Sequence, residues 1–253
     1  MISKAKSKLI RSLAQKKYRE AEDAFVAEGP KVVGDLLATR SALLLMATRE
    51  WLEGKRLPEE TEVLTVTNEE LRRISFLQHP QQVIGVFPLP HPDRISTPEG
   101  KLSLMLDGVR DPGNLGTIIR VADWFGIETV YCSLDTADAY NPKVVQATMG
   151  SIARVNVVYR DLASMLDSLP KGFPVYGTSL DGENIYCQPL STEGIIVMGN
   201  EGKGISPTIA QRVSHKLLIP SFPPGRPTAE SLNVAIATAI TCSEFRRNGN
   251  GNL

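Results

Sequence analysis

Three loops in the second half of the chain combine glycines with polar side chains that could do chemistry. The first covers residues 107–116, reads DGVRDPGNLG, and leads into a predicted helix that carries Arg120. Asn114 is a candidate cap for that helix, and the glycines of this loop allow a ligand or another chain segment to approach closely. Arg120 by itself is explained most simply as a surface residue, because Asp123 lies three positions further on and is a suitable ion-pair partner.

The second loop is GNEGKG, residues 199–204, and it directly follows an apolar stretch of strand length. Glycines in a turn between a strand and a helix often let backbone N–H groups hold a phosphate or a nucleoside. The spacing of the glycines and Lys203 fits neither the dinucleotide fingerprint nor the P-loop, which weakens both interpretations. The carboxylate of Glu201 suits a positively charged cofactor better than a triphosphate. A plain tight turn remains the alternative if this loop is taken alone.

The third loop begins at Ile219 and Pro220, passes through a segment rich in proline and glycine, and ends in SLNV at residues 231–234. Ser231 and Asn233 are polar residues at the start of an otherwise apolar helix. N-capping readily explains one of them, but it explains both less well. The pair is therefore a candidate for contact with a ligand.

The elements around these loops predict an α/β domain that places all three at one edge of a sheet. Apolar runs of strand length alternate with segments of helical periodicity. The predicted strands cover residues 102–106, 129–132, 155–159, 175–178, 195–198 and 216–219, and the predicted helices cover residues 115–125, 142–149, 162–169, 209–213 and 232–245. Such regular alternation predicts a mainly parallel sheet with helices on both faces. Ligands of such sheets bind in the loops at the carboxyl ends of the strands.

A proline-rich segment separates this part of the chain from a smaller N-terminal one. Residues 87–100 contain four prolines and one glycine, so neither a helix nor a central strand is expected there. We predict two domains, residues 1–96 and residues 97–253. In the first, the pattern predicts helices over 7–18, 29–39 and 68–74, the last with Asn68 as its N-cap, and strands over 42–46, 63–66 and 83–87.

The composition is that of an ordinary globular protein. Of the 253 residues 42% are apolar and 22% are charged, and the net charge is zero. Residues 1–20 hold seven Lys or Arg and one acid, which indicates either an arm for RNA phosphates or a solvated helix face. No apolar run reaches the ~18 residues of a membrane span and no signal sequence is recognisable, so we expect a cytoplasmic protein. Three widely spaced cysteines and three histidines form no metal-binding pattern, so we expect no metal.

The order of the three loops is more specific than any one of them. Asn114, Gly116, Arg120, Ala122 and Gly126, followed by the GNEGKG loop and then by Ile219-Pro220 and SLNV, resemble motifs 1, 2 and 3 of the SpoU/TrmH family of RNA 2′-O-ribose methyltransferases. The resemblance spans residues 101–247 and belongs to the SPOUT class. It implies a Rossmann-like parallel sheet with a C-terminal trefoil knot, a homodimer whose active site combines both protomers, and S-adenosylmethionine held by the backbone of the knot loops.

Two further parts of the sequence bear on this resemblance. The N-terminal domain resembles the L30e-like RNA-binding module of the family through Lys17-Tyr18-Arg19 and the FVAEG stretch at residues 25–29. The third loop departs from the family, whose members usually have a short loop with Met after Ile-Pro. Here residues 221–230 intervene and that Met is absent, so the resemblance does not fix the shape of the loop on its substrate side. Arg226, within the insertion, is a candidate phosphate contact.

The resemblance also implies roles for individual residues. Arg120 is implied as the central catalytic residue, and we interpret it as a charged group that orients the adjacent phosphate and lowers the pKa of the 2′-hydroxyl, because a guanidinium scarcely loses its proton. Glu201 would position Arg120 or the cofactor. Ser231 and Asn233 would hold the ribose, and Asn114 would organise its own loop. The expected cofactor contacts are Gly199, Glu201, Gly204, Ile219 and Leu232.

The expected function is therefore methyl transfer from S-adenosylmethionine to a ribose 2′-hydroxyl of RNA. Ribosomal RNA is favoured over transfer RNA, because an added N-terminal module is typical of family members that act on structured ribosomal RNA. The main alternative is a non-catalytic RNA-binding or ribosome-assembly protein on the same fold. The Ser-Leu-Asn sequence argues against a base methyltransferase of a related branch, and the absent phosphate-loop spacings argue against a nucleotide-dependent α/β enzyme.

Overall fold

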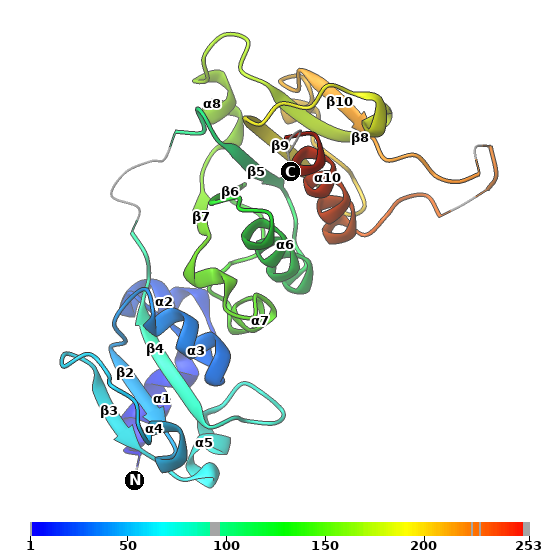
Figure 1. Cartoon of the computed structure of the whole chain (residues 1–253). Coiled ribbons are helices and arrows are strands. Elements are labelled where there is room, and N and C mark those ends of the chain that lie inside the picture. The colour runs from blue at the N-terminus through cyan, green and yellow to red at the C-terminus, as the bar shows by residue number, and fades with distance from the viewer. Residues whose placement is uncertain (1, 92–96, 224, 228, 250–253) are drawn as a thin grey trace. The chain divides into compact units, whose positions relative to one another are not determined.

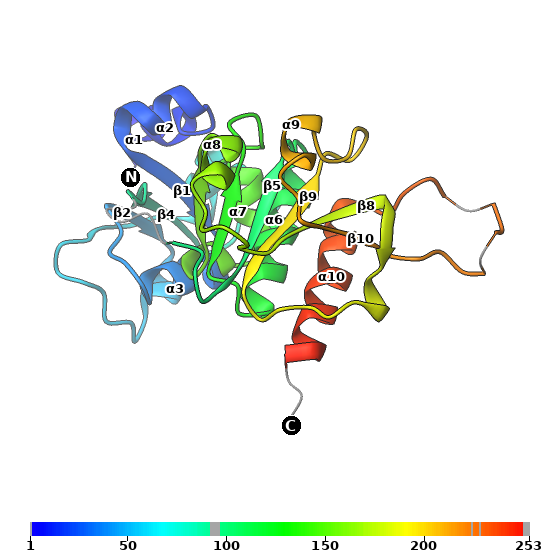
Figure 2. The same ribbon diagram turned by 90° about the horizontal axis from the view of Figure 1, so that it is seen from above.

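The computed structural model describes residues 2–91, 97–223, 225–227 and 229–249 (Figures 1 and 2). The chain divides into two compact units, one holding residues 1–92 and 138–154 and the other residues 93–137 and 155–253. The predicted domain boundary after Ser96 lies among residues 92–96, outside the described part, and stays a prediction. No helix in the described part is long and apolar enough to cross a membrane.

The first unit is a four-stranded sheet with helices packed on it. The strand order is β1-β4-β2-β3, with β4 antiparallel to both of its neighbours and β2 parallel to β3. Its strands are β1 (Ala24–Glu28), β2 (Leu44–Ala47), β3 (Glu62–Thr65) and β4 (Val83–Pro88). Its helices are α1 (Lys4–Ser12), α2 (Lys16–Glu22), α3 (Pro30–Leu37), α4 (Arg49–Leu52), α5 (Asn68–Ile74), α7 (Pro142–Ala147) and the 3-10 helix η1 (Ser151–Ala153).

Local structure corrects the sequence prediction at three points of this unit. The single helix expected over residues 7–18 is wrong, because α1 ends at Ser12, whose hydroxyl donates to the carbonyl of Leu9 at 2.6 Å, and α2 begins only at Lys16. Strand β1 was not predicted, since all five of its residues are buried and the alternation that marks a half-buried strand is missing. The cap of α5 is Thr67, which forms a capping box with Glu70, and not Asn68.

The segment that contains α7 and η1 packs within the first unit. The ring of Tyr140 lies 5.0 Å from that of Phe25 on β1. Arg19, only 2% exposed, forms an ion pair with Asp138 and donates to the carbonyl of Leu13 at 2.6 Å. A buried guanidinium has to be paired in this way, so Asp138 holds this segment in place.

The second unit is a six-stranded sheet in which every strand is parallel to its neighbours, as the sequence predicted. The strand order is β10-β8-β9-β5-β6-β7. Its strands are β5 (Leu102–Asp107), β6 (Thr129–Cys132), β7 (Asn156–Tyr159), β8 (Val175–Asn184), β9 (Gly194–Gly199) and β10 (His215–Leu218). Its helices are α6 (Pro112–Trp124), α8 (Leu162–Asp167), α9 (Pro207–Ala210) and α10 (Val234–Gly249), with the 3-10 helix η2 (Ile185–Cys187).

Helices cover both faces of this sheet. Helices α6 and α10 lie side by side on one face, and α8 and α9 lie on the other (Figure 2). The central strands β5 and β9 are almost wholly buried, which matches their continuous apolar sequence. The core under α8 and α9 joins Met105, Ile195 and Val197 of these strands to Leu166 and Ile209 of the helices.

The strand order reverses direction between β5 and β9. Strand β5 has β6 on one side and β9 on the other, and its last residue, Asp107, is the register partner of Gly199 at the end of β9. Loops that leave an open parallel sheet at such a switch point diverge and form a crevice for ligands. The first two loops identified in the sequence both leave the sheet here.

Candidate active site

The first and second loops are fixed to each other where they leave β5 and β9. The carboxylate of Asp107 accepts a hydrogen bond from the backbone N–H of Ser206 at 2.7 Å. The side-chain amide of Asn200 donates to the carbonyl of Gly108 at 2.7 Å, and its Oδ1 accepts from the N–H groups of Gly202 and Lys203 at 3.0 and 3.1 Å. Asn200 therefore shapes the second loop and ties it to the first.

Asn200 is a residue that the sequence analysis missed. Its only signal was an asparagine in a glycine-rich turn, which is as common in ordinary turns as in functional ones. Its bond across to Gly108 depends on strands β5 and β9 being neighbours, because 92 residues separate the two positions in the chain.

The turn of the second loop leaves no room for a side chain at its first glycine. Asn200 and Gly204 exchange two backbone hydrogen bonds of 3.0 and 2.9 Å. A Cβ atom added at Gly199 would lie 2.2 Å from the carbonyl carbon of Gly204, and Gly204 itself has a φ of +69°. The turn therefore requires both glycines.

A chain of hydrogen bonds joins one side chain from each of the three loops. Asn233 donates from its amide to Oδ1 of Asn114 at 2.9 Å, and Asn114 donates from its amide to Oε1 of Glu201, also at 2.9 Å. Asn233 is held in turn by its own helix, because its Oδ1 accepts from the N–H of Ala235 at 2.9 Å and so caps α10. The structure thus brings together three of the residues singled out in the sequence.

The cap of α6 differs from the one expected. Asp111 caps this helix by accepting the backbone N–H of Asn114 at 2.8 Å, so the expectation that Asn114 is the cap is wrong. The aspartate satisfies that helix end, and the amide of Asn114 is left to bind Glu201 and Asn233.

Arg120 lies exposed on α6. Within the described part of the chain its guanidinium makes no hydrogen bond or ion pair, so the simple surface ion pair with Asp123 is not formed. Glu201 was expected to position either Arg120 or the cofactor, and within this chain it binds Asn114 and, at 3.4 Å, Asn200.

Asn233 connects the third loop to the first through its hydrogen bond to Asn114. The segment between β10 and α10 projects from the body of the second unit (Figures 1 and 2). Ser231 is exposed and makes no hydrogen bond among the described residues, Leu232 is 50% exposed, and Ile219 is half-buried. Pro224 and Thr228, part of the long insertion noted in the sequence, lie outside the described residues.

A second set of polar contacts braces the first loop from the end of β6. Ser133 accepts the N–H of Gly108 at 2.9 Å and donates to Asp135 at 2.7 Å. Arg110 binds the same carboxylate at 2.7 Å, and this guanidinium, with the Ser133 hydroxyl, holds the pKa of Asp135 below its usual range. Asp135 therefore keeps its charge, and Arg110 is held at the rim of the site. No group of three or more His, Cys, Asp or Glu in the described ranges could hold a metal ion.

Family models match both parts of the sequence. Residues 101–243 match the SpoU rRNA Methylase family, and residues 4–85 match the MRM3-like substrate binding domain. The first of these matches contains Asn114, Arg120, Glu201, Ser231 and Asn233.

Individual proteins resemble the chain over nearly its whole length. The 23S rRNA (guanosine(2553)-2′-O)-methyltransferase RlmP of Bacillus subtilis is 32% identical over 242 residues, which cover 93% of this chain and 94% of that protein. A solved structure from Porphyromonas gingivalis, assigned to the TrmH family of RNA methyltransferases, is 44% identical, superposes with a TM-score of 0.89, and matches 98% of this chain and 99% of its own.

An AdoMet-bound rRNA methyltransferase from Sinorhizobium meliloti is 32% identical, with a TM-score of 0.83 and coverage of 98% and 96%. Both solved structures match the chain over its two parts, the N-terminal unit and the parallel sheet alike. The chain belongs to the SpoU rRNA methylase family.

Proposed function

We propose that the protein transfers a methyl group from S-adenosylmethionine to a ribose 2′-hydroxyl of ribosomal RNA. The observation that carries this proposal is the hydrogen-bonded chain Asn233–Asn114–Glu201, which joins three separate loops at the switch point of a parallel sheet. The Bacillus subtilis relative is named for 2′-O-methylation of a guanosine in 23S rRNA, and the Sinorhizobium meliloti structure is that of an rRNA methyltransferase with AdoMet bound.

The cofactor would lie against the turn from Gly199 to Gly204. This turn fits the role, because Gly199 packs directly against the backbone of Gly204 and a compact glycine-rich turn of this kind can present main-chain N–H groups to a ligand. The carboxylate of Glu201 suits the positive charge of the cofactor, and Ile219 and Leu232 would add contacts from the two ends of the third loop. When bound, S-adenosylmethionine supplies an activated methyl group on a sulfonium centre.

The residues of the chain must then assist a weak nucleophile. A ribose hydroxyl is very weakly acidic, so the negative charge that develops on its oxygen has to be stabilised. We assign this task to Arg120, because a guanidinium keeps its proton and can bind the adjacent phosphate through two parallel hydrogen bonds. Within the described part of the chain no carboxylate neutralises Arg120, so its full charge is available to RNA.

Asn114, Asn233 and Ser231 would hold the ribose in line with the methyl group. Two of them are already oriented, since Asn233 is fixed by its helix cap and Asn114 by Glu201. Well-aligned reactants can contribute up to ~7–11 kcal/mol of the rate enhancement. Orientation by this amide chain is therefore a major part of the proposed catalysis.

We further propose that the active site is completed in a homodimer. Helices α6 and α10 pack side by side, and apolar side chains stand out from them: Trp124 is 85% exposed and Ile236 is 52% exposed. A second copy would cover such residues and could approach Arg120 and Ser231.

We also expect the protein to act in the cytoplasm, because its three cysteines are free thiols, as is usual in a reducing compartment.

Methyl transfer from tritiated S-adenosylmethionine to separated ribosomal and transfer RNA tests this function. We expect label in ribosomal RNA, and we expect Arg120→Lys to lose roughly 10²–10³-fold in rate while still binding the cofactor, because Lys cannot form the two parallel bonds. Arg212→Lys is the matched control, since its guanidinium binds Asp167, the last residue of α8, bidentately at 2.8 and 2.7 Å and belongs to none of the three loops. Label in transfer RNA alone would show that transfer RNA, and not ribosomal RNA, is the substrate. No label in either RNA would contradict the proposed methyl transfer.

A further inference from the structure

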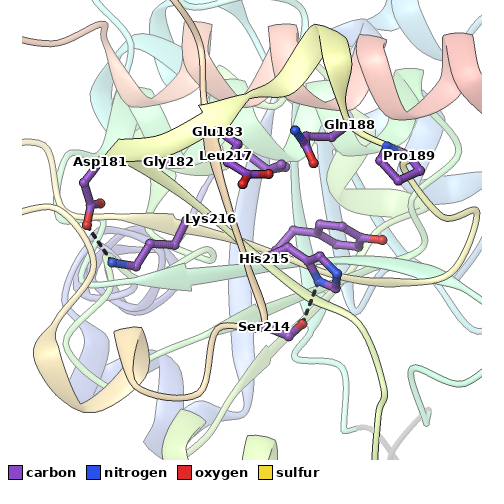
Figure 3. A pocket seen from close by; sticks show the side chains of 10 residues that line it. Asp181, Gly182, Glu183, Gln188, Pro189, Ser214, His215, Lys216 and Leu217 are labelled. Carbon is purple, nitrogen blue, oxygen red and sulfur yellow. Dashed lines mark hydrogen bonds and ion pairs between the residues drawn. The ribbon is translucent and has the colours of Figure 1, made fainter.

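A cavity opens beside β8 and β10, apart from the residues assigned to methyl transfer. Its volume is about 430 Å³, and it is lined by both strands and by the segment that follows β8 (Figure 3). None of Asn114, Arg120, Glu201 or Asn233 lines it. Ligand pockets typically measure ~300–1,000 Å³, so this one has room for a single nucleoside.

One wall of this cavity is an aromatic platform whose orientation is fixed. The exposed ring of His215 stacks on the buried ring of Tyr176, with centroids 4.9 Å apart and planes 29° from parallel. Tyr176 meets Phe245 edge-on at 4.8 Å, and its hydroxyl accepts the N–H of Ser191 at 3.2 Å. Nδ1 of His215 lies 2.8 Å from the hydroxyl of Ser214. The outer face of the imidazole is thus held ready for a planar ligand.

The opposite wall supplies hydrogen-bonding groups that the protein does not use. Glu183 and Gln188 line the cavity across from His215 (Figure 3), and neither side chain makes a hydrogen bond or ion pair within the described residues. Lys216 and Asp181, at the other end, bind each other at 2.6 Å. Among these lining residues, the negative charge of Glu183 is therefore the one that no Lys or Arg side chain neutralises.

We propose that this cavity binds an unpaired guanine base of the RNA substrate, from a nucleotide other than the one that is methylated. This inference rests on the proposed function and adds a subsite to it. Proteins that read RNA stack unpaired bases on aromatic side chains, His included, and bind their Watson–Crick edges by hydrogen bonds. The fixed His215 ring and the unused groups of Glu183 and Gln188 provide both parts of such a site.

The carboxylate of Glu183 selects the base. Guanine carries two neighbouring donors on its Watson–Crick edge, the N1–H and the 2-amino group, which a carboxylate can accept as a pair. The other three RNA bases lack such a pair of adjacent donors. Gln188 can donate to the neighbouring O6, and the uncompensated charge of Glu183 keeps phosphate groups outside the cavity.

Binding of guanosine 5′-monophosphate to the full-length protein tests the site directly. The titration is followed by saturation-transfer NMR, with S-adenosylhomocysteine at saturation so that the cofactor pocket is closed to nucleotides. We expect this nucleotide to bind about tenfold more tightly than inosine 5′-monophosphate, which lacks the 2-amino group and so loses one hydrogen bond to a charged acceptor. Glu183→Gln should abolish this preference.

Further variants separate the platform from general effects. His215→Ala should weaken binding about tenfold through loss of stacking, whereas His215→Phe should retain it. Glu99→Gln, which removes an exposed carboxylate outside the cavity, is the control for charge and should bind like the wild type. Equal binding of the two nucleotides, or unchanged binding in both Glu183→Gln and His215→Ala, would overturn the inference.

Methyl transfer distinguishes failure of the subsite from failure of the proposed function. If the wild type transfers no methyl group to ribosomal RNA, the proposed function fails regardless of nucleotide binding. If the wild type is active and the apparent KM for RNA is unchanged in Glu183→Gln and His215→Ala, the subsite alone is refuted. A raised KM with an unchanged kcat in these two variants would support it.

Discussion

At the scale of single residues, the site depends on amide side chains that act as both donor and acceptor. Asn114 accepts from Asn233 and donates to Glu201, and Asn200 accepts within its own loop while it donates to the neighbouring one. The sequence indicated the first three residues through their order along the chain. It could not indicate that Asn114 binds both Glu201 and Asn233, because these two residues lie 87 and 119 positions from Asn114 and approach it only in the folded sheet.

Asn200→Asp separates the two tasks of that side chain. An aspartate still accepts from Gly202 and Lys203, but it cannot donate to the carbonyl of Gly108 and it sets a second carboxylate beside Glu201. We expect kcat for methyl transfer to fall about tenfold, which corresponds to roughly 1.4 kcal/mol, with a smaller change in the melting temperature.

The matched control for this variant is Asn141→Asp. Asn141 accepts the N–H of Lys143 at 2.9 Å and caps α7, a task that an aspartate performs equally well. This control should keep wild-type activity and stability. Wild-type kcat in Asn200→Asp would show that the link to Gly108 has no part in positioning the loops.

At the scale of elements, the second unit was easier to predict than the first. Parallel strands buried on both faces appear as continuous apolar runs, and β5, β6 and β9 were found in this way. In the first unit β1 is buried from end to end, and its apolar run of residues 24–27 is too short to be told from a piece of a buried helix by periodicity. Residues 138–154 pack on the first unit through long-range contacts, such as the ion pair between Arg19 and Asp138. Local sequence patterns do not contain such contacts.

The turn after β9 makes the glycine requirement testable. Gly199→Ala would force its Cβ to within 2.2 Å of the carbonyl carbon of Gly204, so the turn has to open. We expect a loss of stability of roughly 1–3 kcal/mol and at least about a tenfold weaker affinity for S-adenosylmethionine by calorimetry.

Gly202→Ala provides the comparison in the same loop. A Cβ there would meet only Oδ1 of Asn200, at an ordinary 3.8 Å. Its affinity and stability should stay near those of the wild type. If both variants bound the cofactor normally, the turn would not be part of the cofactor site.

Glu28 makes the stability of the first unit depend on pH. Burial raises the pKa of this carboxyl, and hydrogen bonds from the Ser75 hydroxyl and the Phe76 N–H offset the effect only in part. Because the pKa is higher in the folded state, the folded protein holds the proton more tightly, and the contribution of Glu28 to stability is lost as pH rises through that folded pKa. Glu28→Gln removes this loss.

Thermal unfolding of both proteins from about pH 4 to pH 7 checks the sign of this effect. The melting temperature of Glu28→Gln, measured relative to that of the wild type, should increase as the pH rises. Glu22→Gln, which removes an exposed carboxylate on α2, serves as the control and should show a flat difference. A difference that decreases with pH for Glu28→Gln would contradict the assigned direction.

At the scale of the whole molecule, the sequence indicated the two-part organisation, the parallel sheet and the family. The trefoil knot stays a prediction. The sequence did not indicate the projection of the segment between β10 and α10, nor the position of the cavity beside β8, because strand order and chain path arise from the assembled sheet. The irregular register between β8 and β10, where Leu217 pairs with Glu183, creates that cavity wall and has no signal in the residue pattern.

The proposed homodimer is the prediction that belongs to this scale. We expect the wild type to sediment at twice its chain mass of 27.6 kDa. Trp124→Glu should shift the protein to the monomer and reduce methyl transfer, because a charge replaces an exposed apolar contact on α6. Leu43→Glu, at a 51% exposed position in the first unit, is the control and should leave the dimer intact. A wild type that sediments as a monomer at micromolar concentration would refute the dimer.

The most direct test of the assigned chemistry is to identify the methylated nucleoside. Ribosomal RNA is incubated with the protein and with S-adenosylmethionine that carries a deuterated methyl group, and it is then digested to nucleosides for mass spectrometry. Ribose methylation by the Arg120 site predicts a deuterated 2′-O-methylnucleoside, present with the wild type and absent with Arg120→Ala. A deuterated methyl group on a base, or a 2′-O-methyl product that persists in Arg120→Ala, would contradict it.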